Sequence, residues 1–208
     1  MRKPRAQQRG FTVVELLIAT LVFSVVLMIV TAGIIQVTRV YYKGVTEANT
    51  QSVARSISDV VGQAIQFSPG TVTPTPAVVI PGAQSYFCVG GTVYLYYQGY
   101  ELIDVGANPA KHQTSHSIVA QPFAGGCAGS GFVNGRDLMS PKMRLSKVTV
   151  KNVGSDPNTY QVEVRVVYGD DDVLSNPTGA NAACASVHAG TQFCAVSDLT
   201  TVVVKRVQ

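Results

Sequence analysis

The stretch Arg9-Gly10-Phe11-Thr12-Val13-Val14-Glu15 opens the most apolar part of the chain and decides its organisation. No residue from Leu16 to Thr38 is charged. A helix over this run would be roughly 35 Å long, enough to cross a hydrocarbon core about 30 Å thick. The residues before it include four bases and no acid, namely Arg2, Lys3, Arg5 and Arg9. This asymmetry predicts a membrane-spanning helix whose N-terminus stays on the cytoplasmic side.

Glu15 is the exception inside this apolar segment. An acidic group at the centre of a membrane helix costs about 2.5–3.5 kcal/mol, and less near its end, so such an acid indicates function and requires a partner. A cut between Gly10 and Phe11 would create a new α-ammonium group one helical turn from this carboxylate. In neighbouring helices that are staggered along an axis, the amine of one chain can neutralise the acid of the next.

A basic leader, a glycine, Phe-Thr-x-x-Glu-Leu-Leu-Ile-Ala and an apolar helix follow one another from Arg9 to about Val40. This pattern closely resembles the class III signal of type IV pilins and of the pseudopilins of type II secretion. The resemblance implies that a prepilin peptidase cuts after Gly10 and that the amine of Phe11 is methylated. It also implies that the helix forms a filament core and that Glu15 registers each subunit against its neighbour.

Two other kinds of N-terminal segment are alternatives to this interpretation. An ordinary secretory signal has its apolar region before the cleavage site, and Val30-Thr31-Ala32 is a passable site of that kind. A plain signal anchor is the other alternative. Neither explains Glu15 or the junction between Gly10 and Phe11.

The length and charge of the chain favour a single exported domain with an anchor. With 208 residues, one domain plus a membrane segment is the natural expectation. Once the four basic leader residues are removed, 12 Lys and Arg balance 12 Asp and Glu. The net charge of +4 is therefore a topology signal, and the sequence carries no strong signal for nucleic-acid binding.

The helix is expected to continue beyond the membrane to about Phe67, because the first proline after it is Pro69. Tyr41 and Tyr42 read as an interfacial belt. Beyond them, apolar residues recur every three or four positions and predict a buried stripe, formed by Val45, Ala48, Val53, Ile57, Val60 or Val61, and Ala64. Three glycines mark places where the helix could bend: Gly33, Gly44 and Gly62. The expected divisions are a leader (1–10), a transmembrane and polymerisation helix (11–40), an amphipathic half-helix (41–68) and a β-rich head (69–208).

The head is expected to be strand and loop. Alternation is clearest over Thr159–Tyr168, and Gly90-Gly91 predicts a hairpin turn. The expected strands are Tyr86–Val89, Thr92–Tyr97, Tyr100–Val105, Arg144–Val153, Thr159–Tyr168 and Leu199–Val207, with weaker candidates at Ala77–Ile80 and Ser117–Ala120. Gly106–Pro141 reads as a long irregular connection. The fold class is therefore α+β, with an antiparallel sheet of about four strands across the second half of the helix, as the pilin resemblance also implies.

Four cysteines in an exported domain predict two disulfides, although three pairings are possible. A bond between Cys184 and Cys194 is favoured because it closes a short loop, which leaves Cys88 for Cys127. The resemblance implies that the bracketed segment near the C-terminus is a surface region.

Signals for catalysis or cofactor binding are weak, and no cofactor is expected. Asp170-Asp171-Asp172 is the only acid cluster and could hold Ca²⁺, but a solvated turn is the simpler interpretation. No nucleophile elbow surrounds any serine, and the three histidines fall in expected loops. The tyrosines near Tyr94 and Tyr96 are more typical of sheet packing than of a sticky surface.

The expectation is a non-enzymatic prepilin, anchored once in the cytoplasmic membrane with its head outside and then assembled into an extracellular pilus or periplasmic pseudopilus. Its expected partners are other pilin subunits, a prepilin peptidase, a membrane assembly platform and, before assembly, lipid. A minor pilin is favoured. A pseudopilin of type II secretion or a tip adhesin is the alternative.

Overall fold

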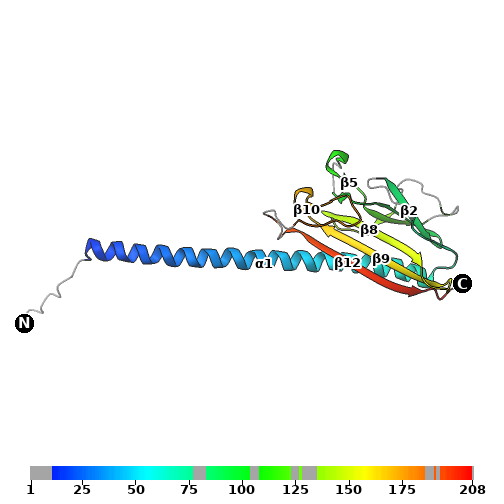
Figure 1. Ribbon diagram of the computed structural model, residues 1–208, viewed down its shortest axis with the longest axis horizontal. Helices are drawn as coiled ribbons and strands as arrows, with labels where there is room; N and C mark the ends of the chain where they lie inside the picture. Colours follow the sequence, from blue (N-terminus) through cyan, green and yellow to red (C-terminus); the bar gives the residue numbers. More distant parts are fainter. Residues whose placement is uncertain are drawn as a thin grey trace, which may run out of the picture. The chain divides into compact units, whose positions relative to one another are not determined.

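One continuous helix dominates the N-terminal third of the chain. The structure, a computed structural model, describes residues 11–76, 83–103, 108–122, 127, 135–185, 190 and 193–207. Helix α1 (Val13–Phe67) is 55 residues long and ends at the predicted residue (Figure 1). Gly33, Gly44 and Gly62 lie within it and do not interrupt it.

The chain divides into two compact units, 1–41 and 42–208. In the first unit, the described residues are exposed throughout, and exposure continues to Val45. The helix is long and apolar enough to cross a membrane, and none of its most apolar window is buried within the chain. The apolar segment therefore has no partner within the described part of its own chain, which is the pattern of a surface made for lipid or for other helices.

The second unit, which we call the head (42–208), uses the last turns of α1 as part of its core. Val53, Ile57 and Val61 are buried, as the stripe predicted. Val45 and Ala48 were wrongly assigned to that stripe, since both are exposed and burial starts only at Thr50. The α1 positions that the head covers are Thr50, Val53, Ala54, Ile57, Ser58, Val61, Gly62 and Ile65.

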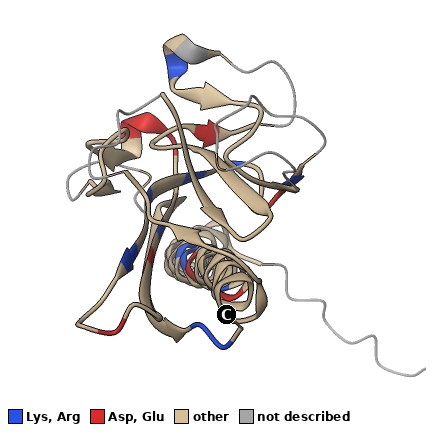
Figure 2. Ribbon diagram, turned by 90° about the vertical axis from the view of Figure 1, so that its right-hand side faces the viewer, with Lys and Arg blue, Asp and Glu red and all other residues tan. Residues whose placement is uncertain are grey.

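In the described part of the head, two five-stranded sheets and a short two-stranded ribbon lie beside α1, which Figure 2 shows end-on. The first sheet has the order β1 (Val72–Thr73), β2 (Gln84–Val89), β3 (Thr92–Tyr97), β6 (Ile118–Pro122), β7 (Arg136–Asp137). The second has the order β12 (Ala195–Val204), β9 (Thr159–Tyr168), β8 (Met143–Asn152), β4 (Glu101–Leu102), β5 (Gln113–Thr114). The ribbon pairs β10 (Leu174–Ser175) with β11 (Ala183–Cys184), and the short 3₁₀ helices are η1 (Pro109–Lys111) and η2 (Asp171–Val173). All pairs are antiparallel except β4 with β5.

The single sheet of about four strands was wrong, although the α+β class and the long strands were correct. The connection 106–141 contributes η1, β5, β6 and β7, so its described residues are not wholly irregular. Strands of two residues carry no alternation that a sequence can show. The predicted strand Tyr100–Val105 shrinks to β4, and the last strand begins earlier, at Ala195, and ends at Val204. The candidate strand Ala77–Ile80 lies outside the described residues.

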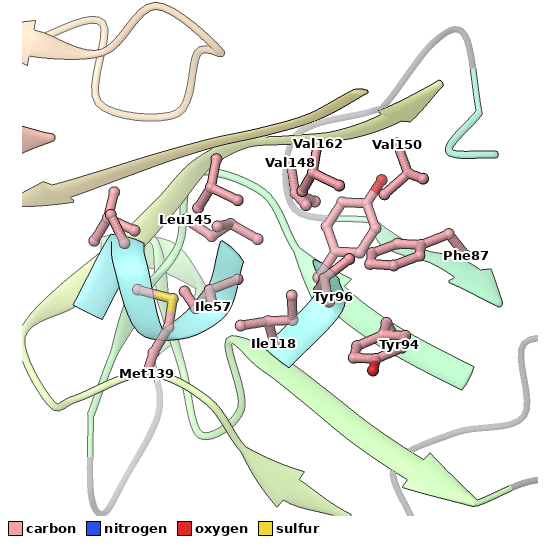
Figure 3. Packing of buried hydrophobic residues seen from close by; sticks show 14 of the residues in the cluster. Ile57, Phe87, Tyr94, Tyr96, Ile118, Met139, Leu145, Val148, Val150 and Val162 are labelled. Carbon is pink, nitrogen blue, oxygen red and sulfur yellow. The ribbon is translucent and has the colours of Figure 1, made fainter. Parts of the chain in front are cut away.

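The main core lies where α1 and the two sheets meet. Figure 3 shows Ile57 of α1 beside Leu145 of β8, with Phe87 and Tyr94 contributed by the first sheet. The rings of Phe87 and Tyr94 are stacked with their centroids 4.8 Å apart. The tyrosines of β3 are therefore packing residues, as expected, and α1 is held to the head by apolar burial.

The last strand closes the head against the helix (Figure 1). The hydroxyl groups of Ser58 in α1 and Thr201 in β12 are 3.0 Å apart. Beyond β12, the Arg206 amide donates to the Gln66 carbonyl at 3.0 Å. Since β12 also pairs along its whole length with β9, the final strand joins the sheet to the first element of the head.

Candidate functional site: the start of the helix

Thr12 and Glu15 close the N-terminus of α1 with a capping box. The backbone amide and the hydroxyl of Thr12 donate to Oε2 of Glu15, at 2.9 and 2.8 Å. In return the Glu15 amide donates to the Thr12 hydroxyl oxygen at 3.3 Å. These bonds satisfy helix-end donors that would otherwise lack partners. The negative charge also lies in the first turn, where the helix dipole favours it.

Phe11 lies immediately before this cap and is the most exposed large apolar residue of the chain's described part, at 86%. Gly10 and the rest of the leader lie outside the described residues. A free amine on Phe11 would stand at the same end of the helix as the Glu15 carboxylate. Both hydrogen bonds to Glu15 use one oxygen, and among the described residues no donor contacts Oε1.

The hydroxyl groups within the apolar segment bond to their own helix. Ser24, Thr31 and Thr38 each donate to the carbonyl four residues earlier, at 2.7 to 2.8 Å. Thr20 donates to the Leu17 carbonyl at 3.0 Å. Because an apolar medium offers no water for hydrogen bonding, this pairing lets the segment present an apolar outer surface.

A charged cap, followed by an exposed helical segment without charge up to Thr38, is the geometry expected of the proposed signal. Residues 5–31 match the family model of the prokaryotic N-terminal methylation motif. This motif is the class III signal of type IV pilins, so the resemblance stated from the sequence is confirmed. No curated protein and no solved structure matches the chain. The methylation motif supports a type IV pilin-like or pseudopilin subunit, and together with the apolar helix it fits a membrane-anchored chain.

The four cysteines, all C-terminal to the methylation motif, form two disulfides in the head. Cys88 is bonded to Cys127, and Cys184 to Cys194, which is the pairing favoured on loop length. The first bond joins β2 to a residue 39 positions later, and the second joins β11 to the residue before β12.

The acid cluster does not form a metal site in the described part of the chain. Among the described residues, no three His, Cys, Asp or Glu side chains converge to hold an ion. Asp171 instead turns toward Arg144, and its Oδ1 lies 2.7 Å from Nη1 of that arginine. Asp170 and Asp172 on either side are exposed. Among the described residues no further acid joins these three, and the calcium hypothesis stays a prediction.

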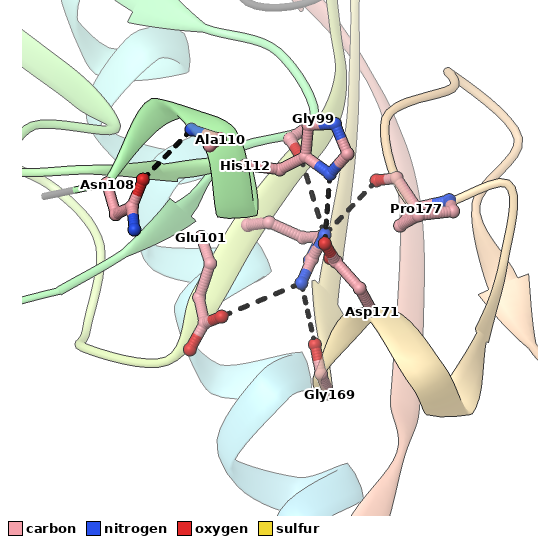
Figure 4. Close-up of polar contacts among 9 residues, drawn as sticks. Gly99, Glu101, Asn108, Ala110, His112, Gly169, Asp171 and Pro177 are labelled. Carbon is pink, nitrogen blue, oxygen red and sulfur yellow. Dashed lines mark hydrogen bonds and ion pairs between the residues drawn. The ribbon is translucent and has the colours of Figure 1, made fainter.

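Arg144 is fully buried and lies on the side of β8 away from the main core, opposite Val167. Its guanidinium donates to Oδ1 of Asp171 at 2.7 Å and to the Gly169 carbonyl at 2.9 Å. Oε2 of Glu101 is 3.7 Å away, and Asp171 also contacts Nδ1 of His112 at 2.9 Å (Figure 4). Arg144 thus ties the segment that follows β9 to β4 and to the loop that carries His112.

The two carboxyl groups around Arg144 respond differently to their surroundings. Burial alone would raise the pKa of Asp171, but hydrogen bonds from His112 and Arg144 outweigh it and lower the pKa. For Glu101, burial dominates and raises the pKa despite the opposing charge of Arg144. Asp171 is therefore the principal counterion of this buried cation.

Sequence reasoning missed both Thr12 and Arg144. The signal for Thr12 was present, because Thr-x-x-Glu before an apolar run is the capping-box pattern. Arg144 gave no usable signal. Its position in β8, on the face away from the main core, is typical of a solvent-facing residue, and segments distant in the sequence, including Glu101 and the residues that follow β9, surround it.

Proposed function

We propose that the chain is a prepilin, a structural subunit that is cut after Gly10, methylated on Phe11 and polymerised through α1. The observation that carries this proposal is a carboxylate, Glu15, in the first turn of an exposed helical segment that carries no other charge up to Thr38. A plain anchor needs the apolar surface but not the acid. The match to the methylation motif supports the same conclusion.

In this mechanism the apolar half of α1 is solvated by lipid before assembly and by other helices afterwards. Lipid tails are as apolar as the side chains, so association depends on close packing and on polar pairing. The methylated amine of one subunit would approach the unused Oε1 of Glu15 in its neighbour. This pairing fixes the axial register, because only one stagger brings the two charges together.

The division of the chain follows from this mechanism. Residues 1–10 are the leader, 11–40 form the transmembrane and polymerisation helix, 41–68 the amphipathic half-helix, and 69–208 the rest of the head. The subunit is structural rather than enzymatic. Its partners are other pilin subunits, a prepilin peptidase and a membrane assembly platform, and its head stands outside the cytoplasmic membrane before it joins a filament.

Within this class we favour a minor pilin of a type IV pilus. Two five-stranded sheets and two disulfides make a large head for a subunit repeated along a whole fibre. A pseudopilin of type II secretion and a tip adhesin are the alternatives. Counting copies in isolated filaments separates these roles, since a few copies at the tip indicate a minor or adhesive subunit and abundant copies along the fibre a major one.

Mass spectrometry of the native N-terminus tests the proposal most directly. The mature chain should begin at methylated Phe11. Gly10→Leu should block the peptidase and leave the protein at precursor mass in the membrane, while a conservative change outside the motif, Val37→Leu, should be processed normally. A native chain that retains its first ten residues, or that begins at Gly33, would contradict the proposal.

A further inference from the structure

A cavity of about 360 Å³ lies in the head where three loops meet. Lys142 comes from the turn before β8, and Tyr168 from the end of β9. Asp170 and Asp172 flank the start of η2, and Phe193 belongs to the disulfide-closed segment. The volume lies at the small end of the range for small-molecule sites, about 300–1,000 Å³.

The charged side chains around this cavity are not paired with one another. In the described part of the chain, the side chains of Lys142, Asp170 and Asp172 form no hydrogen bond and no ion pair. Asp171, between the two acids, is held by Arg144 and so fixes the backbone that carries them. The site therefore presents one cation, two carboxylates and two aromatic rings. The two carboxylates stand on a loop whose backbone the Asp171–Arg144 pair holds in place.

One residue that lines the cavity contacts the first residue of the head's part of α1. The ring of Phe193 lies 6.1 Å from that of Tyr42, centroid to centroid, and each residue is half exposed. Tyr42 follows the uncharged run by only four residues, which is about 6 Å of helix. Aromatic rings at such a position lie at the level of lipid head groups.

We infer that this cavity binds the zwitterionic head group of a phospholipid, phosphoethanolamine by its chemistry, in the membrane-anchored state of the proposed function. The phosphate would pair with Lys142 and the ammonium with Asp170 and Asp172. The rings of Phe193 and Tyr168 would supply apolar contact and cation–π attraction. An anionic head group without an amine would face two unpaired carboxylates, so the site selects the zwitterion.

Soluble head-group analogues test the binding chemistry on the full chain in detergent. The protein contains no tryptophan, so Phe193→Trp provides a single fluorescent reporter at the cavity. Glycerophosphoethanolamine should give a saturable change in its emission, whereas glycerol 3-phosphate and ethanolamine should each bind at least about tenfold more weakly, because each lacks one charge-assisted contact. Equal responses to all three compounds, or no response, would overturn the inference.

Two variants test which charged side chains bind the head group. In the reporter background, Lys142→Asn and Asp172→Asn should each weaken glycerophosphoethanolamine binding about tenfold. Asparagine suits position 142 because φ there is 65°, in the left-handed region. The matched controls Lys111→Asn and Asp59→Asn, on exposed residues outside the cavity, should bind as the reporter does. Unchanged binding in the cavity variants would overturn the inference.

Bilayer measurements place the site at the membrane. In phosphatidylethanolamine bilayers, lipids brominated close to the head group should quench the tryptophan at position 193, and lipids brominated deep in the chains should quench it little. Emission as in water would contradict the inference. That result would leave the prepilin proposal standing, since the mature N-terminus and filament assembly test that proposal independently.

Discussion

Glu15 has two roles that can be separated by substitution. In the single chain its carboxylate caps α1 through Thr12, and in the proposed filament it meets a neighbouring amine. A glutamine at this position can retain the capping box but carries no charge. The choice of substituent therefore distinguishes the hydrogen bond from the charge.

Glu15→Val should allow membrane insertion and cleavage but impair filament assembly, because the neighbouring amine loses its counterion. Glu15→Gln should impair assembly nearly as strongly while it preserves the helix start. The measurements are the mature mass and the yield of sheared filaments. If Glu15→Gln assembled normally, the cap rather than the charge would be the essential feature.

Arg144 provides the residue-scale prediction for the head. Removing one partner of a buried ion pair costs about 3–5 kcal/mol, and the partial exposure of Asp171 reduces the expected loss for Asp171→Asn to about 2 kcal/mol. Chemical denaturation of the full chain in detergent measures this loss. Asp172→Asn, next to it and exposed, should change the free energy of unfolding by less than about 0.5 kcal/mol.

The same pair gives stability a dependence on pH. Because the folded state lowers the pKa of Asp171, its contribution is fully present above the unfolded-state value of 3.8 and is lost as the pH falls through the lower folded-state value. Asp171→Asn should remove that acid-side loss. Glu101, whose pKa is raised, acts in the opposite sense, so a loss that persisted in the variant would point to other carboxylates.

At the scale of elements, the continuity of α1 makes a prediction about its glycines. A Cβ added at Gly44 meets nothing within 4 Å, and one added at Gly62 meets only Val203, at 3.4 Å. Gly44→Ala and Gly62→Ala should each stabilise the chain by about 0.5–1 kcal/mol. Thermal unfolding checks this, and a loss of stability at Gly44 would mean that the helix must bend there.

Gly90 is the contrasting control for these two substitutions. It has a φ of 57° in the turn between β2 and β3, and a Cβ there would lie 1.8 Å from the Ser68 hydroxyl oxygen. Gly90→Ala should therefore destabilise the head in the same assay. The Gly90 amide also donates to the Thr71 carbonyl at 3.0 Å, which joins this turn to the segment after α1.

Helices and strands with a long residue pattern were predicted from the sequence better than short ones. Thr159–Tyr168 alternates over ten residues and was found at its full extent, and Phe67 ended α1 because Ser68-Pro69-Gly70 stops a helix. Strands such as Gln113–Thr114 exist only because longer neighbours pair with them. The start of the α1 stripe was misplaced at Val45 because amphipathic spacing continues beyond the part that the sheets cover.

The functional residues also differ in how far the sequence could predict them. The motif around Gly10, Phe11 and Glu15 is local in sequence and could be recognised. The Arg144 cluster is assembled from four separate segments, and adjacency of that kind leaves no mark in any one of them. Lys142 and Phe193, which line the cavity, are likewise far apart in the sequence and come together only in the folded head.

At the scale of the whole molecule, the final strand is the test of how the head holds α1. Deleting residues 198–208 removes Thr201 and Val203 from their places against α1. The truncated chain should be cut rapidly by a protease within the head, while the full chain resists under the same conditions. Equal resistance of the two chains would show that the other strands suffice to cover the helix.

If the head is exported as proposed, the contact between α1 and β12 joins a part that crosses the membrane early with a part that crosses late. Until the final dozen residues have crossed the membrane, the apolar stripe from Val53 to Ile65 lacks its complete cover. A head whose export stopped before this point would keep the apolar stripe exposed, and would be prone to aggregation and proteolysis. In the proposed pathway, only a subunit whose β12 has crossed the membrane and packed against α1 would be fit to enter a growing fibre.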